Sequence, residues 1–136
     1  MTLTVQLIKA PQLTRFNKES DINVIGSFDN EFEALKFAAI NKPAIILLDY
    51  ELEKENTVLF INSLHLETPN SKVMLFGKNL SDEIILSCMI SFISGYMEWR
   101  DVAKFLNKAI HSIDKGEAWF SRRLVGLLIH KLQESI

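Results

Sequence analysis

Apolar and polar positions change their spacing repeatedly along the first 115 residues, as expected of a chain that alternates between strands and helices. Five short runs rich in apolar or β-branched residues predict strands, at 3–8, 22–26, 44–48, 73–76 and 95–97. The run at 44–48 is apolar without interruption and ends in a charge. Such a run is typical of a central parallel strand that is covered on both faces.

Between these runs the apolar positions recur at helical spacing, and polar residues suited to N-capping precede several of them. Pro43 marks the end of the second helix, and the N-caps expected are Asp29 or Asn30, Ser81 and Asp101. The pattern predicts helices over Gln12–Glu19, from about 30 to 42, over Glu53–Leu66, from Ser81 onwards, and from Asp101 to about Lys115. Five strand–helix units in succession imply an α/β fold with a parallel sheet and right-handed crossovers.

A sixth helix is expected after this pattern ends. Leu124, Leu128 and Leu132 recur at a spacing of four, with Val125, Ile129 and Ile136 beside them, so the apolar stripe is wider than a single contact line. Gly116 is suited to ending the preceding helix, and Ser121 is suited to capping the new one.

The start of this last helix has the chemistry of an anion site. Its free N–H groups and dipole favour a phosphate, and Arg122 and Arg123 add full charges. Trp119 offers a face for stacking, and an arginine can reach guanine O6 and N7. The combination suits a guanine nucleotide. The alternative is that the tryptophan is a packing anchor and the arginines are a solvated face.

Charge and composition exclude several other classes. The 136 residues carry a net charge of −2, so a broad electrostatic surface for DNA is not expected. The single cysteine, Cys88, excludes an internal disulfide framework and predicts a buried apolar thiol. His65, His111 and His130 each stand alone on an expected helix, so neither a metal site nor an enzyme is indicated. No signal segment or membrane-length apolar run is present, and a cytoplasmic protein is expected.

The segments Ile46-Leu47-Leu48-Asp49-Tyr50 and Ser94-Gly95-Tyr96-Met97 resemble response-regulator receiver domains. This resemblance implies a flavodoxin-like doubly wound fold with five parallel strands. It places Asp49 at the position that accepts a phosphoryl group. Gly95-Tyr96 and the linker start Gly116-Glu117 resemble the NarL/FixJ branch.

The other receiver positions depart from this pattern. Ile8 and Lys9 stand where the resemblance implies an acidic pair for Mg²⁺, Phe76-Gly77 replaces the switch hydroxyl, and Trp99 replaces the lysine. Asp49 is therefore interpreted as a vestigial phosphoacceptor position with a structural role, paired with Lys9 or bonded to loop N–H groups. The aromatic group Phe92, Tyr96 and Trp99 is interpreted as a filled active-site remnant, with a second protein contact as the alternative.

Trp119-Phe120-Ser121-Arg122 resembles the four-residue motif of the VpsT branch of VpsT/CsgD-type biofilm regulators, which belong to the LuxR/FixJ family. The resemblance implies that Trp119, Phe120, Ser121 and Arg122 bind cyclic di-GMP between two protomers, with Arg123 as a weaker candidate. It also implies a homodimer in which the sixth helix forms the interface. The interface residues expected there are Leu124, Val125, Leu128 and Ile129.

The resemblance divides the chain into a degenerate receiver domain at 1–115 and a linker with the sixth helix at 116–136. The helix-turn-helix domain through which such regulators bind DNA has no counterpart here. We interpret the chain as the regulatory half of a longer transcription factor that controls biofilm and exopolysaccharide genes without phosphorylation, with a natural single-domain form as the alternative. The alternative function is a pseudo-receiver that dimerises without nucleotide or binds a protein partner.

Overall fold

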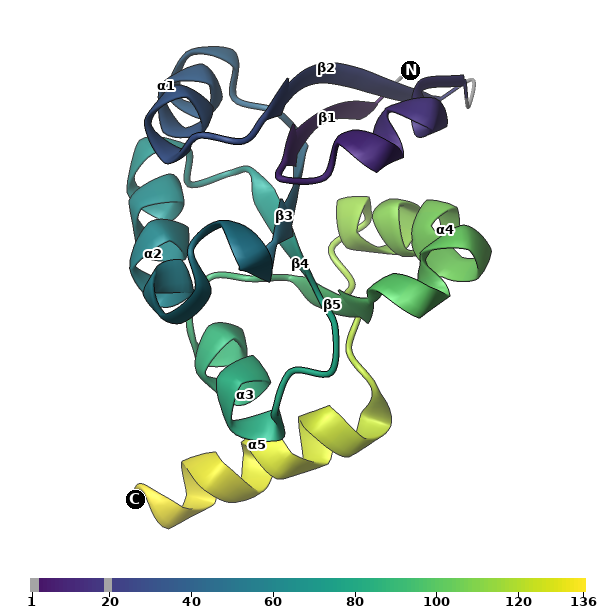
Figure 1. Ribbon diagram of the computed structural model, residues 1–136. Coiled ribbons are helices and arrows are strands. Elements are labelled where there is room, and N and C mark those ends of the chain that lie inside the picture. The colour runs from purple at the N-terminus through teal and green to yellow at the C-terminus, as the bar shows by residue number, and fades with distance from the viewer. Residues whose placement is uncertain (1–2, 19–20) are drawn as a thin grey trace.

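A computed structural model describes residues 3–18 and 21–136 and contains one five-stranded parallel sheet (Figure 1). The spatial order of its strands is β2-β1-β3-β4-β5. The strands are β1 (Leu3–Ile8), β2 (Ile22–Phe28), β3 (Ile45–Asp49), β4 (Lys72–Gly77) and β5 (Gly95–Glu98). This arrangement confirms the five expected strands and the doubly wound fold class.

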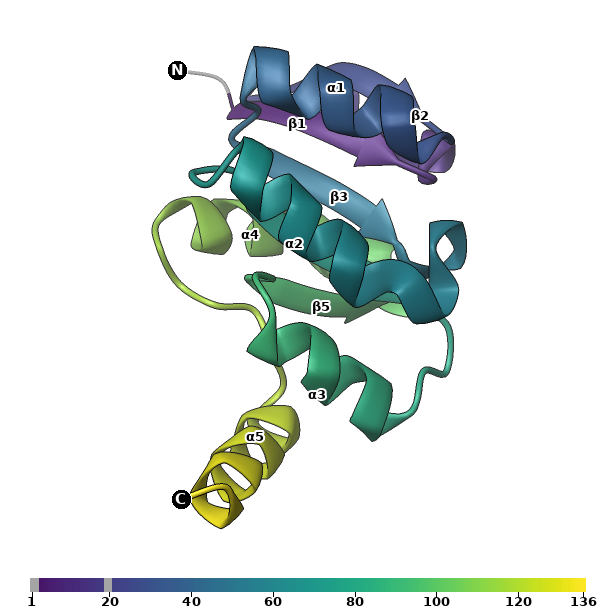
Figure 2. The ribbon, with the colours of Figure 1, turned by 90° about the vertical axis from the view of Figure 1, so that its left-hand side faces the viewer.

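Helices cover both faces of the sheet (Figures 1 and 2). One face carries three helices, α1 (Glu31–Asn41), α2 (Thr57–Glu67) and α3 (Asp82–Ile90), and the other carries α4 (Val102–Asp114) and a 3₁₀ helix at Pro11–Lys18. Alternate residues of β3 serve the two cores: Ile46 and Leu48 pack under the first group, and Ile45 and Leu47 under the second. The prediction that this strand is covered on both faces is confirmed.

Two expected helices differ from the prediction. The first is a 3₁₀ helix, which begins as Leu13 N–H donates to the carbonyl of Ala10, three residues earlier, at 3.0 Å. Its expected last residue, Glu19, lies outside the described residues. The third helix begins at Thr57 rather than Glu53, because two 3₁₀ turns precede it, Tyr50–Leu52 and Lys54–Asn56.

The caps are partly as expected. The side chain of Asn30 accepts hydrogen bonds from the N–H groups of Phe32 and Glu33, and Ser81 accepts one from Ile84. Asp101 stands at the N-cap position of α4 as expected, but its side chain makes no cap hydrogen bond. Asp101 also ends a 3₁₀ turn, Trp99–Asp101, that leads into α4.

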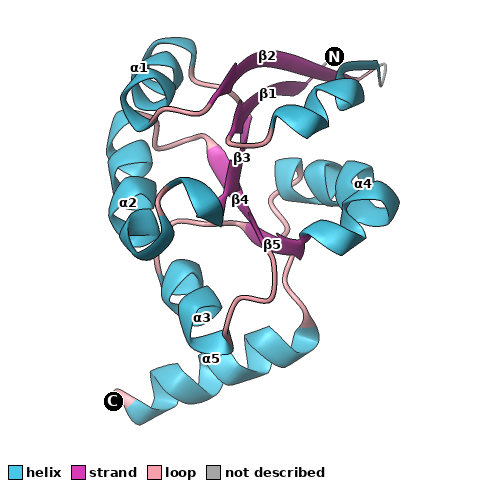
Figure 3. Cartoon of the chain, in the orientation of Figure 1, coloured by secondary structure: helices cyan, strands magenta, loops and turns pink. Residues whose placement is uncertain are grey.

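The last helix, α5 (Arg122–Glu134), lies beyond the β5 edge of the sheet and beside α3 (Figure 3). Gly116 ends the preceding helix with a positive φ of 94°, a conformation that glycine adopts without steric cost. Ser121 caps α5 through its hydroxyl. Among the described residues, none of the helices is both long enough and apolar enough to span a membrane.

Candidate functional site

The segment before α5 is fixed to β5 by backbone hydrogen bonds. Trp119 N–H donates to the carbonyl of Ser94 at 2.9 Å, and Tyr96 N–H donates to the carbonyl of Trp119 at 3.0 Å. These bonds form a parallel bridge between Gly95 and Trp119. A Cβ at Gly95 would lie 2.9 Å from the side chain of Ile113 and 3.1 Å from Cβ of Trp119, so the close approach requires glycine.

The two aromatic side chains of the motif pack on opposite sides of this bridge. The Trp119 ring is half-buried and tilted against Phe105, with 6.4 Å between ring centroids. Phe120 is also half-buried and packs against the core under α3 and α5. Both rings therefore contribute to the fold while keeping part of their surface open to solvent.

The two arginines at the start of α5 differ in their partners. Arg123 forms an ion pair with Asp82 of α3, with 2.6 Å between Nη1 and Oδ2, and its guanidinium lowers the pKa of that carboxyl. Arg122 is exposed and has no hydrogen-bond or ion-pair partner among the described residues. The Ser121 hydroxyl accepts from Leu124 N–H at 3.1 Å. Arg122 is thus the free cation beside the free N–H groups of the helix.

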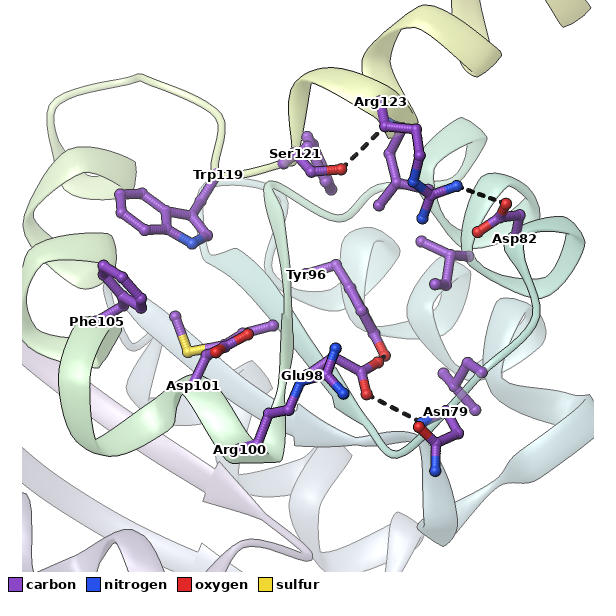
Figure 4. A pocket seen from close by; sticks show the side chains of 15 residues that line it. Asn79, Asp82, Tyr96, Glu98, Arg100, Asp101, Phe105, Trp119, Ser121 and Arg123 are labelled. Atoms are coloured by element: carbon purple, nitrogen blue, oxygen red, sulfur yellow. Dashed lines mark hydrogen bonds and ion pairs between the residues drawn. The ribbon is translucent and has the colours of Figure 1, made fainter.

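An open cavity of about 590 Å³ lies between the start of α5, the end of β5 and α4 (Figure 4). Trp119, Phe120 and Ser121 line it together with Arg123, whereas Arg122 is not part of its lining. The cavity brings one aromatic face, one helix start and several charged side chains together.

Sequence reasoning did not find the polar residues that β5 and the 3₁₀ turn after it contribute to this cavity. Arg100 and Asp101 line it, as does Glu98, whose carboxylate accepts from Asn79 N–H at 3.0 Å and from the Tyr96 hydroxyl. Burial and then this carboxylate raise the pKa of Tyr96. These polar residues lie near Trp119 because the backbone of Trp119 pairs with β5. The local sequence gives no sign of that pairing.

The residues expected at a dimer interface are divided between two sides of α5. Leu124 is only 4% exposed and belongs to the core under α3, and Leu128 packs against the same core. Val125 and Ile129 are exposed, together with Leu132 and Ile136. Leu124 is therefore covered within its own chain and has almost no surface for a second protomer, whereas the interface role of the half-buried Leu128 stays a prediction.

Asp49 lies at the end of β3 and is buried beneath an aromatic side chain. Its carboxylate accepts from Glu51 N–H at 3.0 Å and from the Trp99 indole N–H at 3.2 Å. The Trp99 ring stacks on Phe76 with 4.9 Å between centroids. Burial raises the pKa of Asp49 despite both hydrogen bonds, which favour the charged form.

The expected loop N–H partner of Asp49 is therefore confirmed. Lys9, the other expected partner, is exposed with φ at 59° and makes no ion pair with Asp49. Ile8 is buried in the core, at the position where a receiver would need an acidic residue. Across residues 3–18 and 21–136, no three His, Cys, Asp or Glu side chains gather to hold a metal ion.

The aromatic residues and the cysteine singled out in the sequence make packing contacts. Phe92 stacks on His65 at 3.6 Å between centroids and so stands apart from Trp99, which stacks on Phe76. Cys88 is buried, as expected, and burial raises the pKa of its thiol to about 11. A thiol of this kind is a packing residue rather than a nucleophile.

No protein-family model matches the sequence. The chain is similar to the response regulator protein VraR of Staphylococcus aureus, with 21% identity over 140 residues that cover 98% of this chain and 67% of that protein. Among solved structures, a LuxR-family two-component response regulator from Aurantimonas sp. SI85-9A1 aligns with a TM-score of 0.81 and 15% identity, covering 96% of this chain and 98% of that one.

The apo receiver domain of RcsB from Salmonella enterica serovar Typhimurium aligns with a TM-score of 0.82 and 15% identity, covering 93% of this chain and 98% of that one. These likenesses confirm the receiver fold of response regulators. The assignment to the VpsT/CsgD branch and the division of the chain after residue 115 stay predictions.

Proposed function

We propose that this receiver-fold chain, which is similar to LuxR-family response regulators, is the regulatory half of a transcription factor that binds cyclic di-GMP and dimerises. The observation that carries the proposal is the Trp119–Arg122 motif at the start of α5, beside an open cavity that contains further charged side chains. In this proposal the ligand, rather than a phosphoryl group, controls biofilm and exopolysaccharide genes through an attached DNA-binding domain.

The chemistry of the α5 start supports a guanine dinucleotide. The unpaired guanidinium of Arg122 lies at the positive end of the helix dipole, where a phosphate is held by charge and by backbone N–H groups. The exposed part of the Trp119 ring provides a surface for a guanine base. Arg100 adds a further guanidinium in the lining of the adjacent cavity.

The outer face of α5 supports dimerisation. Val125 and Ile129 are 39% and 51% exposed and continue into Leu132 and Ile136, so the apolar stripe runs the length of the helix. Two copies of this stripe facing each other would make a two-fold contact, and a dinucleotide at each helix start would lie at its end. RcsB, which has the same fold, has been solved as two dimers bound to two parallel DNAs.

The surroundings of Asp49 support independence from phosphorylation. The Trp99 indole N–H is hydrogen-bonded to the Asp49 carboxylate, which is the group that a phosphoryl group would need. The buried Ile8 side chain provides no oxygen for Mg²⁺. We expect no labelling of the chain by acetyl phosphate and Mg²⁺. Labelling at Asp49 would contradict this part of the proposal.

The decisive experiment is isothermal titration of the chain with cyclic di-GMP, with light scattering on the same sample. We expect heat of binding together with a shift from monomer to dimer. The Arg122→Ala variant should lose both, because it lacks the free cation, and Lys131→Ala, at the far end of the same helix, is the matched control. A flat titration on folded protein would reject the nucleotide.

A second candidate function is dimerisation or partner binding without nucleotide. The exposed stripe on α5 favours it, because this surface exists without any ligand, and the partial burial of Trp119 in packing favours it too. In that case light scattering would detect a dimer before cyclic di-GMP is added. Ile129→Asp would abolish that dimer, and Arg122→Ala would leave it unchanged.

A further inference from the structure

A second open cavity, of about 380 Å³, lies on the opposite part of the molecule, between the N-terminal halves of α1 and α2. Phe32 of α1 and Leu59 of α2 form its outer walls and are 75% and 67% exposed. Leu35 and Phe60 line it more deeply and pack against the core. The side chains of Phe32 and Leu59 are left largely uncovered by the rest of the chain. Exposed apolar walls around a cavity mark a surface for binding.

The two segments that contribute to this groove are rich in acidic residues. Residues 31–36 and 51–56 contain five glutamates and two lysines. Glu31 and Glu53 line the cavity itself, one from the start of α1 and the other from between the two 3₁₀ turns that precede α2. Burial and then the neighbouring Glu31 raise the pKa of Glu53 to about 7.

These two features complement each other. A cation placed between Glu31 and Glu53 would relieve their repulsion, and a neighbouring apolar side chain would enter between Phe32 and Leu59. A short segment that carries both a cation and an apolar side chain on one face is a basic amphipathic helix. Amphipathic helices are frequent ligands of apolar grooves.

We propose that the α1/α2 groove docks a basic amphipathic helix of a partner protein, with an apolar side chain in the cavity and a lysine or arginine at the Glu31–Glu53 pair. This docking is independent of the nucleotide proposed for the α5 end of the molecule.

A second copy of the chain is a less suitable occupant, although α5 itself is amphipathic and basic. If α5 of one copy entered the groove of the next, the contact would be heterologous and would propagate into open chains. It would also consume the α5 stripe on which the two-fold contact relies. A partner helix from another protein meets neither conflict.

The test uses two synthetic helical peptides of about 15 residues, the length at which an isolated helix begins to be stable in water. Both carry the same leucine stripe, one with lysine and arginine on its polar face and the other with glutamate. Binding of each labelled peptide to the complete chain is measured by fluorescence anisotropy. We expect the basic peptide to bind and the acidic peptide not to bind.

Four variants locate the contact. Phe32→Ser and Leu59→Ser should weaken binding of the basic peptide roughly tenfold or more, the effect of losing one buried apolar side chain. The double variant Glu31→Gln/Glu53→Gln should reduce the preference for the basic peptide. Ile40→Ser, which alters an equally exposed residue of α1 outside the cavity, should change nothing. All five altered positions are exposed or half-buried, so circular dichroism should show unchanged folding.

Three outcomes would overturn the proposal. Equal binding of the two peptides would show that charge is not read, and equal weakening by Phe32→Ser and Ile40→Ser would show that the cavity is not the site. Self-association of the wild-type chain that Leu59→Ser abolishes would identify a second copy as the occupant. None of these outcomes depends on whether cyclic di-GMP binds.

Discussion

Polar groups gather at the carboxyl end of β3 and at the start of α5. The polar side chain is buried at the first place and exposed at the second. At the end of β3, Asp49 is 8% exposed and held by the indole of Trp99. At the start of α5, Arg122 is exposed and unpaired beside an open cavity. The first arrangement buries a hydrogen-bonded carboxylate, and the second leaves charge and aromatic surface exposed.

This contrast shows how a fold can keep its architecture while its accessible chemistry moves. The sheet, crossovers and both cores of a receiver are present, so the scaffold does not depend on an acidic site at the ends of β1 and β3. Aromatic packing of Trp99 on Phe76 fills the space instead.

The first prediction concerns how firmly α5 belongs to the domain. Leu124→Ala should lower the free energy of unfolding by about 2–5 kcal/mol, because it leaves a cavity in the core between α3 and α5. Ile129→Ala, on the outer face of the same helix, should cost less than about 0.5 kcal/mol. Urea denaturation followed by circular dichroism measures both. Equal costs would show that α5 is not part of the cooperative unit.

The second prediction tests the closed site. Trp99→Phe keeps an aromatic ring on Phe76 but removes the N–H donor to Asp49, and should lower stability at pH 7 by about 1–3 kcal/mol. The pKa of Asp49 is already raised by burial, so its charge costs stability above the folded-state pKa.

That cost disappears as pH falls through the folded-state pKa of Asp49 towards its unfolded value. The difference between wild type and Trp99→Phe should therefore shrink in acid. Urea titrations between neutral and acidic pH measure it. A difference that is constant with pH would mean that the indole stabilises the fold by packing alone.

The third prediction separates this acid effect from another titration. His111 of α4 contacts Asp21 at 2.5 Å, and the Asn107 carbonyl, followed by that carboxylate, holds the pKa of His111 above its usual value. The protonated pair stabilises the fold fully below the unfolded-state pKa, and this contribution is lost as pH rises through the folded-state pKa.

Both side chains are partly exposed, so Asp21→Asn should cost no more than about 1 kcal/mol at pH 5.5 (about one unit below the usual histidine pKa), and less at higher pH. Stability curves of Asp21→Asn and wild type should converge above the folded-state pKa. If they remain parallel, the contact is a neutral hydrogen bond rather than an ion pair.

The smallest effect is expected at the open site. Arg123→Ala removes an exposed ion pair with Asp82 and should leave thermal stability almost unchanged, because solvent screens such pairs. Cyclic di-GMP binding should decrease less than in Arg122→Ala, since Arg123 is already engaged. Titration calorimetry on the two variants measures this difference in binding. A larger loss of binding in Arg123→Ala than in Arg122→Ala would mean that Arg123, and not Arg122, is the main contact to the ligand.

Much of the fold could be predicted from the sequence because its signals are local. The uninterrupted run at 44–48 identified the central strand, and Gly116 and Ser121 identified the end of one helix and the start of the next. The 3₁₀ turns before α2 were missed, since they depend on Asp49 accepting the N–H of Glu51 and on a positive φ at Lys54.

The site was less predictable because its contacts join distant residues. Trp99 reaches Asp49 across 50 positions, and Arg100 meets the motif only because the segment at Trp119 pairs with β5. The stripe on α5 is apolar on two sides, so periodicity could not say that Leu124 and Leu128 face α3 whereas Val125 and Ile129 face solvent.

The pairing of Trp119 with β5 has a consequence for solubility and for signalling. An edge strand with free N–H and carbonyl groups is a template for pairing with other chains, and the linker occupies the N–H of Tyr96 in β5 and the carbonyl of Ser94 just before it. Peeling the linker and α5 away would uncover that template and favour aggregation. If α5 receives a signal, as proposed, a shift of the helix that keeps these two hydrogen bonds would transmit it without exposing the edge of the sheet.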